Sequence, residues 1–454
     1  MIERLVLFGA TGDLAGRYLL PALAALHAGG RLPDGFEVVG GSRENLDEDG
    51  FRRMAVERLE KHAADMPAAA REKVVRSLRY RPVDVSNSAS VASLVEPRSG
   101  PVAAYLALPP ALFPAAVTAL GSVRLATGSR VALEKPFGED LASAIALNRL
   151  LAEALGPAGE QSVFRVDHVL GMATVQNLLT MRLANSVLEA VWDGDHVDQV
   201  EILWEETLAL EGRAGYYDRT GALKDVVQNH MLQVLSLVGM EPPASLDDGG
   251  GLCERKTEAL RSIRPPTREE ASSRTRRARY GAGRLASGEA VPAYADEEGV
   301  DPARATETYT EVVVDLDSPR WAGTRFVLRA GKALAERRKG VLLRFRPSAR
   351  SDADPNRLWI GVDGPDEISL HLTGRGGSPL GPVPLALAAA PPASDLPAYA
   401  HVLADLLEGG STISVGGDEA EEAWRAVTPV LEAWADGAVP LLEYPAGSMG
   451  PEPL

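Results

Sequence analysis

The feature that most constrains the fold is a short apolar run near the N-terminus that ends in a glycine turn. Residues 5–8 read Leu-Val-Leu-Phe, Gly9 follows at once, and residues 14–27 carry apolar side chains at helical spacing. A short apolar run closed by glycine is typical of a buried parallel strand. Strand-like and helix-like segments continue to alternate, with strands expected at 36–40, 102–108 and 130–134 and a helix at 140–155. This alternation predicts a Rossmann-like, doubly wound parallel sheet.

The turn after the first strand has the composition of a dinucleotide-binding site. Glycines allow a tight turn and let a pyrophosphate approach the backbone. The helix that follows offers unpaired N–H groups and the positive end of its dipole. An ordinary glycine turn is the alternative, but the position directly after the first strand favours a nucleotide. The residues expected to contact the cofactor here are Gly9, Thr11, Gly12, Asp13 and Leu14.

The residue after the second strand usually meets the adenosine ribose. Here Arg43 is followed by Glu44. An arginine pairs with a 2′-phosphate, whereas a carboxylate binds a free 2′-hydroxyl and repels a phosphate. The two signals conflict. We expect NADP, bound through Arg43, and leave NAD or the use of both cofactors open.

Beyond residue 166 the pattern changes. Extended runs follow one another without a helix between each pair, which favours a large, mainly antiparallel sheet with surrounding helices. We therefore expect a dinucleotide-binding Rossmann-like domain at 1–166 and a substrate-binding and oligomerisation α+β domain at 167–454. Strands are expected at 200–204, 311–316, 324–329, 340–346, 358–362 and 368–372, helices at 173–188, 223–238, 399–407 and 418–436, and loop or tail in the Pro-, Ala- and Gly-rich segments 374–394 and 444–454.

Composition excludes several classes of function. The 454-residue chain has a formal net charge of −16 and a pI near 5.0, and such a field repels nucleic acid and anionic membranes. The basic run Arg274–Arg279 is expected to be a solvated face. The single cysteine, Cys253, permits no internal disulfide and no thiolate metal cluster, and we expect no metal. The sequence shows neither a secretory leader nor an apolar stretch that could span a bilayer, so we expect a cytoplasmic protein.

A series of short motifs occurs along nearly the whole chain. They lie at 105–110, 131–138, 165–171, 215–230, 329–334 and 444–448. Segment 131–138 resembles the E-K-P-x-G motif of the glucose-6-phosphate dehydrogenase family, and 165–171 resembles its R-I-D-H-Y-L-G-K motif. Segment 215–230 resembles its G-Y-Y-D and D-x-x-Q-N-H motifs, and 329–334 its R-x-G-K-x-L motif, while 105–110 and 444–448 fit the family as well. Any one of them has a structural alternative, such as a core histidine or a solvated lysine. The whole series in one order identifies the chain as a member of that family.

The resemblance implies the oxidation of a sugar hemiacetal to a lactone. It places the general base at His230, a residue type whose ordinary pKa suits that task, and a carboxylate that orients the imidazole at Asp167. Lys135 is expected between nicotinamide and sugar, and Pro109 at the cofactor. The resemblance also implies a homodimer or homotetramer. The residues expected to contact the sugar are His168, Val169, Met172, Glu206, Asp225 and Lys332.

The chain departs from the family where the sugar phosphate binds. The family has tyrosine and lysine where this chain has Val169 and Met172, and a lysine where it has Tyr18; only His168 remains. A phosphate dianion needs charge-assisted partners to offset its desolvation. We therefore expect an unphosphorylated hexose, such as glucose, as the substrate. The first alternative is glucose 6-phosphate, with arginines such as Arg17 or Arg182 supplying the charge.

A second alternative belongs to another class of function. The chain could be a non-catalytic paralogue that binds sugar or nucleotide and regulates a partner. The retention of His230, Asp167 and Lys135 argues against that role, because a regulatory protein is free to lose them.

Overall fold

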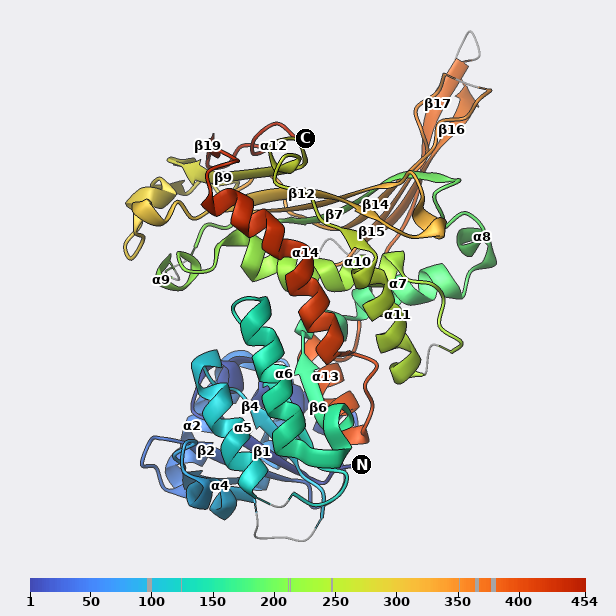
Figure 1. Cartoon of the computed structure of the whole chain (residues 1–454). Coiled ribbons are helices and arrows are strands. Elements are labelled where there is room, and N and C mark those ends of the chain that lie inside the picture. Colours follow the sequence, from blue (N-terminus) through green and yellow to red (C-terminus); the bar gives the residue numbers. More distant parts are fainter. Residues whose placement is uncertain are drawn as a thin grey trace. The chain divides into compact units, whose positions relative to one another are not determined.

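The computed structural model describes residues 1–95, 100–123, 125–210, 212, 214–245, 248–350, 352–363, 367–376 and 381–454 (Figure 1). No helix among these residues is long and apolar enough to cross a membrane. The chain divides into two compact units. The first comprises Met1–Ala173, Pro243–Glu254 and Ser394–Glu421, and the second comprises Thr174–Pro242, Arg255–Ala393 and Glu422–Leu454.

The first unit contains a seven-stranded sheet in the order β18-β6-β5-β4-β1-β2-β3. Its strands pair in parallel except β18, which runs antiparallel to β6. Strand β1 lies inside the sheet between β4 and β2 and is buried throughout, as the apolar run at residues 5–8 predicts. The strands are β1 (Arg4–Phe8), β2 (Glu37–Ser42), β3 (Leu78–Pro82), β4 (Ala103–Leu106), β5 (Arg130–Glu134), β6 (Val163–Val166) and β18 (Ser414–Val415).

Helices connect these strands and give the alternation that the sequence predicts. Some begin with side-chain caps, as α6 does, where the Asp140 carboxylate accepts from the Ser143 N–H. The helical elements are η1 (Ala15–Leu19), α1 (Leu20–Ala28), α2 (Glu48–His62), α3 (Ala68–Ser77), α4 (Ser88–Val95), η2 (Pro110–Leu112), α5 (Phe113–Ser122), α6 (Leu141–Leu155), η3 (Gly156–Ser162), η4 (His168–Gly171) and α13 (Ala398–Glu408).

The second unit is built on a larger sheet in the order β17-β16-β15-β14-β7-β13-β12-β9-β19, with β8 paired to β12. Pairing is antiparallel except for β7 with β13 and β9 with β19. The strands are β7 (Val197–Glu205), β8 (Ile263–Arg264), β9 (Thr275–Gly281), β12 (Tyr309–Leu316), β13 (Arg325–Gly331), β14 (Arg338–Phe345), β15 (Arg357–Gly361), β16 (Ile368–Gly376), β17 (Gly381–Ala389) and β19 (Leu441–Pro445).

One face of this sheet is lined by helices, of which η5 contacts β7 and β13 (Figure 1). A separate ribbon pairs β10 (Gly283–Arg284) with β11 (Ala290–Val291). The helical elements are α7 (Ala173–Leu183), α8 (Ser186–Glu189), α9 (Ala214–Tyr217), η5 (Leu223–Met231), α10 (Leu232–Gly239), α12 (Ala271–Arg274), η6 (Tyr294–Asp296), η7 (Pro302–Arg304) and η8 (Pro319–Trp321), together with α11 (Gly249–Arg261) and α14 (Gly417–Ala435), whose residues are divided between the units.

The prediction of loop or tail for 374–394 and 444–454 is wrong in part. Strand β17 lies within the first segment, and β19 extends into the second. Proline is tolerated in β17 because this is an edge strand: Pro382 and Pro384 are two residues apart, so their missing N–H groups face the same side. Residues 377–380 lie outside the described part of the chain.

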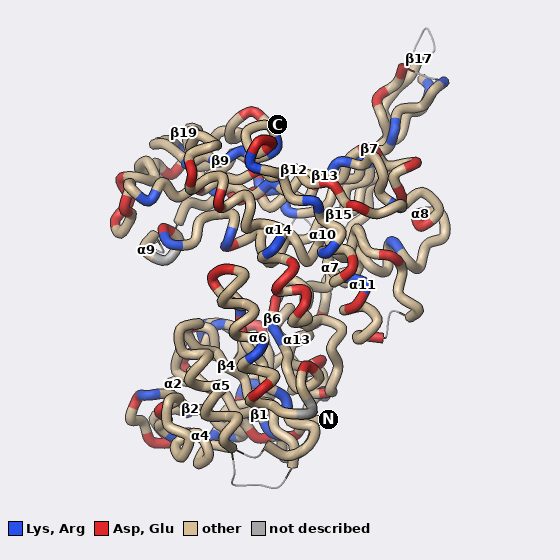
Figure 2. Tube along the Cα trace, in the orientation of Figure 1, with Lys and Arg blue, Asp and Glu red and all other residues tan. Residues whose placement is uncertain are grey.

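Charges of both signs are distributed along the trace of each unit (Figure 2). The basic run predicted as a solvated face begins at the end of α12 and continues in strand β9 of the sheet. Arg274 pairs with Asp315 at 2.7 Å, and Arg279 pairs with Glu443 at 2.9 Å. Both arginines are partly buried and paired, so the prediction of a solvated face is wrong for these two side chains.

Candidate active site

In the first unit, the glycine turn is forced by its surroundings. Gly9 has a φ of +77°, and a Cβ atom there would lie 2.1 Å from the Ala107 carbonyl oxygen. The Gly9 N–H donates to the Gly41 carbonyl at 2.8 Å, and the Gly12 N–H donates to Gly9 at 2.9 Å. Only glycine therefore fits at position 9. Gly12 is exposed, so the backbone of the turn is accessible there. An accessible glycine backbone before a helix fits the pyrophosphate of a dinucleotide.

A π-helical turn, η1, follows the glycine turn before α1 begins. π-Helical segments are rare in proteins, and those that occur are frequently found at functional sites. The side chains predicted to meet the cofactor lie at its start: Thr11 donates to Glu44 at 2.8 Å, and Asp13 pairs with Arg17 at 3.2 Å. Leu14 is partly buried directly before η1.

Several predicted residues lie at the same edge of the parallel sheet. Gly9 follows β1, Arg43 follows β2, Pro109 follows β4, Lys135 follows β5 and Asp167 follows β6. Because these strands are parallel, their carboxyl ends share one edge, which is where open α/β sheets bind ligands. Arg43 and Pro109 are exposed, and Lys135 is partly buried.

The carboxylate beside Lys135 is held in an apolar setting. Glu134 is buried at the end of β5, and the Tyr105 hydroxyl donates to it at 2.5 Å. Burial raises the pKa of Glu134 to about 7, although the bond from Tyr105 opposes the shift. A carboxyl group that titrates near neutral pH therefore lies at the predicted cofactor edge.

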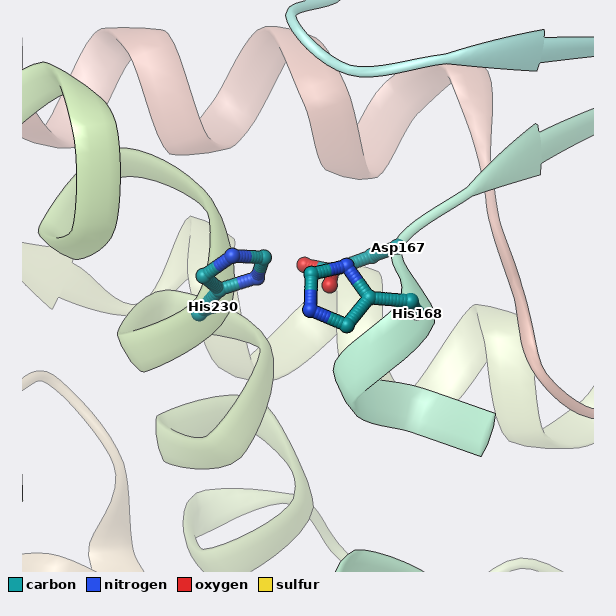
Figure 3. A group of neighbouring side chains, drawn as sticks. All are labelled: Asp167, His168 and His230. Carbon is teal, nitrogen blue, oxygen red and sulfur yellow. The ribbon is translucent and has the colours of Figure 1, made fainter. Parts of the chain in front are cut away.

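Asp167 and His168 begin the short helix η4 (Figure 3). Asp167 is buried, and its Oδ1 accepts the Val169 N–H at 3.1 Å. The His168 ring stacks on Tyr399, with centroids 5.6 Å apart and planes at 10°. The Tyr18 ring also packs against Tyr399, with ring centroids 5.3 Å apart. The three rings thus form one aromatic cluster, which we call the Tyr399 cluster.

The residues that replace the family's phosphate-binding side chains differ in their exposure. Val169 is fully buried, whereas Met172 is partly exposed and Tyr18 is 46% exposed. Neither Val169 nor Met172 offers charge or a strong hydrogen bond. The Tyr399 cluster therefore places aromatic surface next to His168, where the family pattern has cations.

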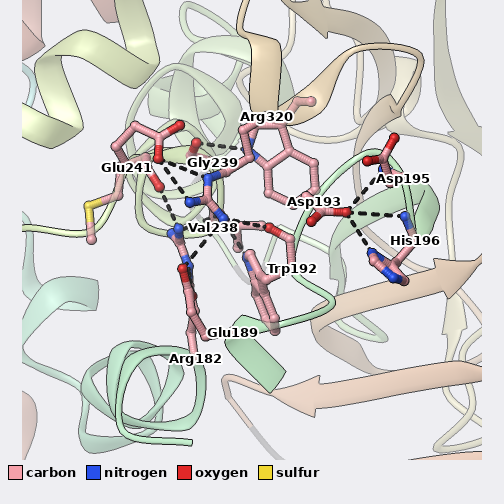
Figure 4. A network of polar contacts seen from close by, with 12 residues as sticks. Arg182, Glu189, Trp192, Asp193, Asp195, His196, Val238, Gly239, Glu241 and Arg320 are labelled. Atoms are coloured by element: carbon pink, nitrogen blue, oxygen red, sulfur yellow. Dashed lines mark hydrogen bonds and ion pairs between the residues drawn. The ribbon is translucent and has the colours of Figure 1, made fainter. Parts of the chain in front are cut away.

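Arg182 is not free to supply the missing charge. It is fully buried and donates to the carbonyls of Leu237 and Val238 at 3.1 Å and of Met240 at 2.6 Å (Figure 4). Its Nε donates to Glu189 at 3.4 Å. These bonds satisfy the carbonyls at the C-terminal end of α10. The suggestion that Arg182 replaces a phosphate-binding cation is therefore wrong.

In the second unit, η5 carries both Asp225 and His230; Figure 3 shows His230. This π-helix runs directly into α10, and such helices are rare outside functional sites. His230 is 5% exposed, and its backbone N–H donates to Asn229 Oδ1 at 2.7 Å. The imidazole stacks on Trp204, with centroids 5.7 Å apart. The histidine predicted as the base is thus buried and oriented by an indole, while Asp225 is partly exposed.

Glu206, which directly follows β7, is held between two lysines. Lys332 lies 2.6 Å from its Oε2, and Lys339 lies 2.9 Å from its Oε1. Burial raises the pKa of Glu206, but the two ammonium groups outweigh it and lower the pKa to about 2. The structure therefore brings together Glu206 and Lys332, as expected for residues that bind one polyol.

Sequence reasoning missed Lys339, Trp204 and Tyr399. One signal existed for Lys339: it alternates with Val341 and Leu343, so the period-two pattern of the strand places it on a buried face. Tyr399 is far along the chain from its stacking partners Tyr18 and His168, and local patterns do not encode such a contact.

These features define the class of protein. A glycine turn at the carboxyl edge of a doubly wound sheet binds dinucleotides. The second unit adds a buried histidine and a carboxylate held by lysines. The chain is a nicotinamide-dependent oxidoreductase that acts on a CH–OH group.

Comparison with known families gives the particular family. Residues 6–177 match the glucose-6-phosphate dehydrogenase NAD binding domain, and residues 179–454 match the glucose-6-phosphate dehydrogenase C-terminal domain. The chain belongs to the glucose-6-phosphate dehydrogenase family. This result confirms the resemblance that the motifs indicate.

Known relatives match over almost the entire chain. Glucose-6-phosphate 1-dehydrogenase of Zymomonas mobilis is 35% identical, covering 99% of this chain and 96% of the relative. That of Mycolicibacterium smegmatis is 36% identical, covering 98% and 94%. A solved structure of glucose-6-phosphate dehydrogenase in complex with its substrate glucose-6-phosphate has a TM-score of 0.90 at 29% identity, covering 99% of this chain and 95% of that one. These matches confirm the predicted fold class.

Proposed function

We propose that the chain oxidises the anomeric hydroxyl of glucose 6-phosphate to the lactone, with NADP as the hydride acceptor. The observation that carries this proposal is the match of both units to one family whose named relatives are glucose-6-phosphate dehydrogenases. These comparisons support glucose 6-phosphate better than the unphosphorylated hexose that the sequence favours.

His230 is proposed to be the general base. A bound nicotinamide would accept the hydride that leaves the anomeric carbon. The imidazole of His230 is proposed to take the hydroxyl proton while the lactone C=O forms. A histidine suits this task because its pKa lies near neutral pH. Asp167 is proposed to hydrogen-bond the imidazole, fixing its tautomer and stabilising the cation that forms.

The remaining predicted residues position the reactants. Glu206 stays ionised at neutral pH and can accept sugar hydroxyls. Lys332 and Asp225 are proposed to share that task, and Lys135 to lie between sugar and nicotinamide. Positioning of this kind supplies much of the rate enhancement when the cofactor carries the hydride chemistry.

NADP is favoured by the surroundings of the second strand. Glu44, which would repel a 2′-phosphate, accepts the Thr11 hydroxyl at 2.8 Å, while Arg43 is exposed. An arginine in this position can pair with a 2′-phosphate. We therefore infer that NADP is preferred over NAD.

Oxidation of an unphosphorylated hexose is the second candidate. The observation that favours it is the replacement of the family's phosphate-binding residues by Val169, Met172 and Tyr18, with Arg182 committed elsewhere. The test is NAD(P)H formation with glucose 6-phosphate and with glucose. Faster turnover of glucose at equal concentrations would favour this candidate, and cofactor binding without reduction would favour the regulatory alternative.

A homodimer or homotetramer is a further part of the proposal. It rests on the family resemblance and on exposed apolar side chains, Leu385 at 49% and Leu387 at 62%, on strand β17. The hairpin of β16 and β17 projects from its unit (Figure 1), and exposed apolar patches of this kind mark interaction sites. Sedimentation velocity tests this proposal, and a monomer at micromolar concentration would contradict it.

A further inference from the structure

Lys339 occupies a position where the strand pattern calls for an apolar side chain. On β14 it alternates with Val341 and Leu343, both fully buried, and it is itself 8% exposed. In the register of the sheet, Lys339 lies opposite Trp204 on β7. A lysine is rarely buried without partners, because removing its charge from water is costly. Its retention at this point therefore calls for an explanation.

The ammonium group of Lys339 is enclosed by three groups. It lies 2.9 Å from Glu206 and 2.9 Å from Asp363. It also lies 4.9 Å from the centre of the Trp204 ring, within the range of a cation–π contact. Asp363 in turn pairs with Arg337 at 2.8 Å. The buried charge of Lys339 is thus compensated on two sides and covered on a third.

The contact with Glu206 fixes a carboxylate that Lys332 alone would leave free to rotate. Lys332 binds Oε2, and Lys339 binds Oε1, so the two oxygens have different partners. Charged and titratable groups reach Glu206 from three places: Lys332 after β13, Lys339 on β14 and Tyr217 on α9. With both ammonium groups present, the pKa of Glu206 falls to about 2, although burial opposes the shift.

The contact with Trp204 links Lys339 to the predicted base. Trp204 is 7% exposed and packs against His230 as well as Lys339. One lysine therefore touches the carboxylate predicted to bind the sugar and the indole against which His230 stacks. Lys332 contacts Glu206 but stacks on Tyr217 instead of Trp204.

We propose that Lys339 is a positioning residue for sugar oxidation, holding Glu206 ionised with its lone pairs aimed at the sugar hydroxyls and bracing Trp204 behind His230. This inference rests on the proposed roles of Glu206 and His230. It assigns to Lys339 an action through these neighbours, without contact with the sugar.

The test compares Lys339→Met with Lys339→Arg. A methionine fills similar volume without charge, so kcat/KM for the sugar is expected to fall at least about tenfold, whereas arginine keeps the charge and restores most of it. Arg344→Met is the matched control: it lies on the same strand, and its partner is Glu201. That control is expected to retain wild-type kinetics.

The pH dependence separates positioning from a merely structural role. In Lys339→Met the pKa of Glu206 should rise toward its ordinary value of 4.5, so below about pH 5 kcat/KM should fall more steeply than in the wild type, in addition to the decline that protonation of a histidine base causes at higher pH. In a Glu206→Gln background the effect of Lys339→Met should largely disappear, since the pair is already broken.

Unchanged kcat/KM in Lys339→Met at every pH would overturn the inference, as would an equal loss in the Glu206→Gln background. If the wild type oxidises no sugar, the proposed function fails by itself. The inference then stands or falls on the carboxyl titration of Glu206, followed by 13C NMR of labelled glutamate: an unchanged pKa in Lys339→Met, or in Lys339→Ala should the first variant not fold, would refute it.

Discussion

The residues proposed to meet the reacting end of the sugar, which belong to the second unit, and those proposed to meet its phosphate end, which belong to the first unit, have different surroundings. At the reacting end, His230 is buried against Trp204, and Glu206 has a cation on each oxygen. At the phosphate end, His168 is joined by the aromatic rings of Tyr399 and Tyr18. The first region keeps the charged groups that we propose for sugar oxidation, whereas the second has aromatic side chains where the family pattern has cations.

This difference leads us to propose that reaction type and substrate identity depend on separate groups. The class of reaction follows from the match of the chain to both family models, and the residues proposed for proton transfer lie in segments that resemble the family's motifs. The affinity for a phosphate depends on a few cations that a fold can lose without changing shape. Substitutions at each region should therefore change different kinetic quantities.

The largest effect is expected for His230→Asn. Removal of the general base should lower kcat by about 10²- to 10⁴-fold, with a smaller change in KM, because the proton has no acceptor while the sugar contacts persist. Steady-state kinetics measures this effect. His196→Asn, at a half-exposed histidine paired with Asp193, serves as the control. Near-wild-type turnover in His230→Asn would contradict the proposal that His230 is the general base.

Gly9→Ala should abolish tight binding of the cofactor while leaving the sugar groups intact. The new Cβ would lie 2.1 Å from the Ala107 carbonyl, and φ is +77°, so the turn must move. We expect the Kd for NADP to rise about tenfold or more, measured by fluorescence titration. Gly30→Ala also has positive φ, at +63°, but nothing lies within 4 Å of its Cβ. Equal effects of both changes would point to general instability.

Met172→Lys probes the phosphate end. A lysine restored at this partly exposed position should raise kcat/KM for glucose 6-phosphate about tenfold and leave that for glucose nearly unchanged, since a charge-assisted contact benefits only the phosphate. Met449→Lys adds the same charge at an exposed methionine elsewhere. If glucose 6-phosphate kinetics stay the same, other cations already hold the phosphate and the contrast between the two ends is weaker than described.

The smallest effect is expected for Arg43→Ala. Loss of a partner for the 2′-phosphate should lower kcat/KM with NADP about three- to tenfold and leave NAD almost unaffected, because an exposed ion pair is worth little. Initial rates with both cofactors measure the ratio, with Arg53→Ala as an exposed-arginine control. An unchanged ratio would assign the cofactor preference to another residue.

The sequence predicts the frame of the fold because that frame follows local patterns. The apolar run of β1 and the alternation of strands and helices identify the parallel sheet. The proline-bearing strand β17 escapes prediction, because proline signals a loop unless the edge position is known. The domain boundary expected at residue 166 stays a prediction; the first compact unit ends its opening segment at Ala173 and includes two later segments.

Within the candidate site, motifs locate the charged residues but not their partners. Lys332 and Glu206 are predicted from separate motifs, and the structure adds their contact. The commitment of Arg182 to the end of α10 and the stack of Tyr399 on His168 depend on residues far apart in sequence. Such contacts arise from the tertiary fold, which a single sequence does not list.

The most direct test is the rate of NAD(P)H formation by the purified protein with glucose 6-phosphate and with glucose, each against NADP and NAD. The proposed function predicts that both cofactors are reduced, with a higher kcat/KM for NADP than for NAD. It also predicts a higher kcat/KM for glucose 6-phosphate than for glucose. A clear preference for glucose would contradict it and establish the second candidate. Absence of reduction with every pair would contradict sugar oxidation itself.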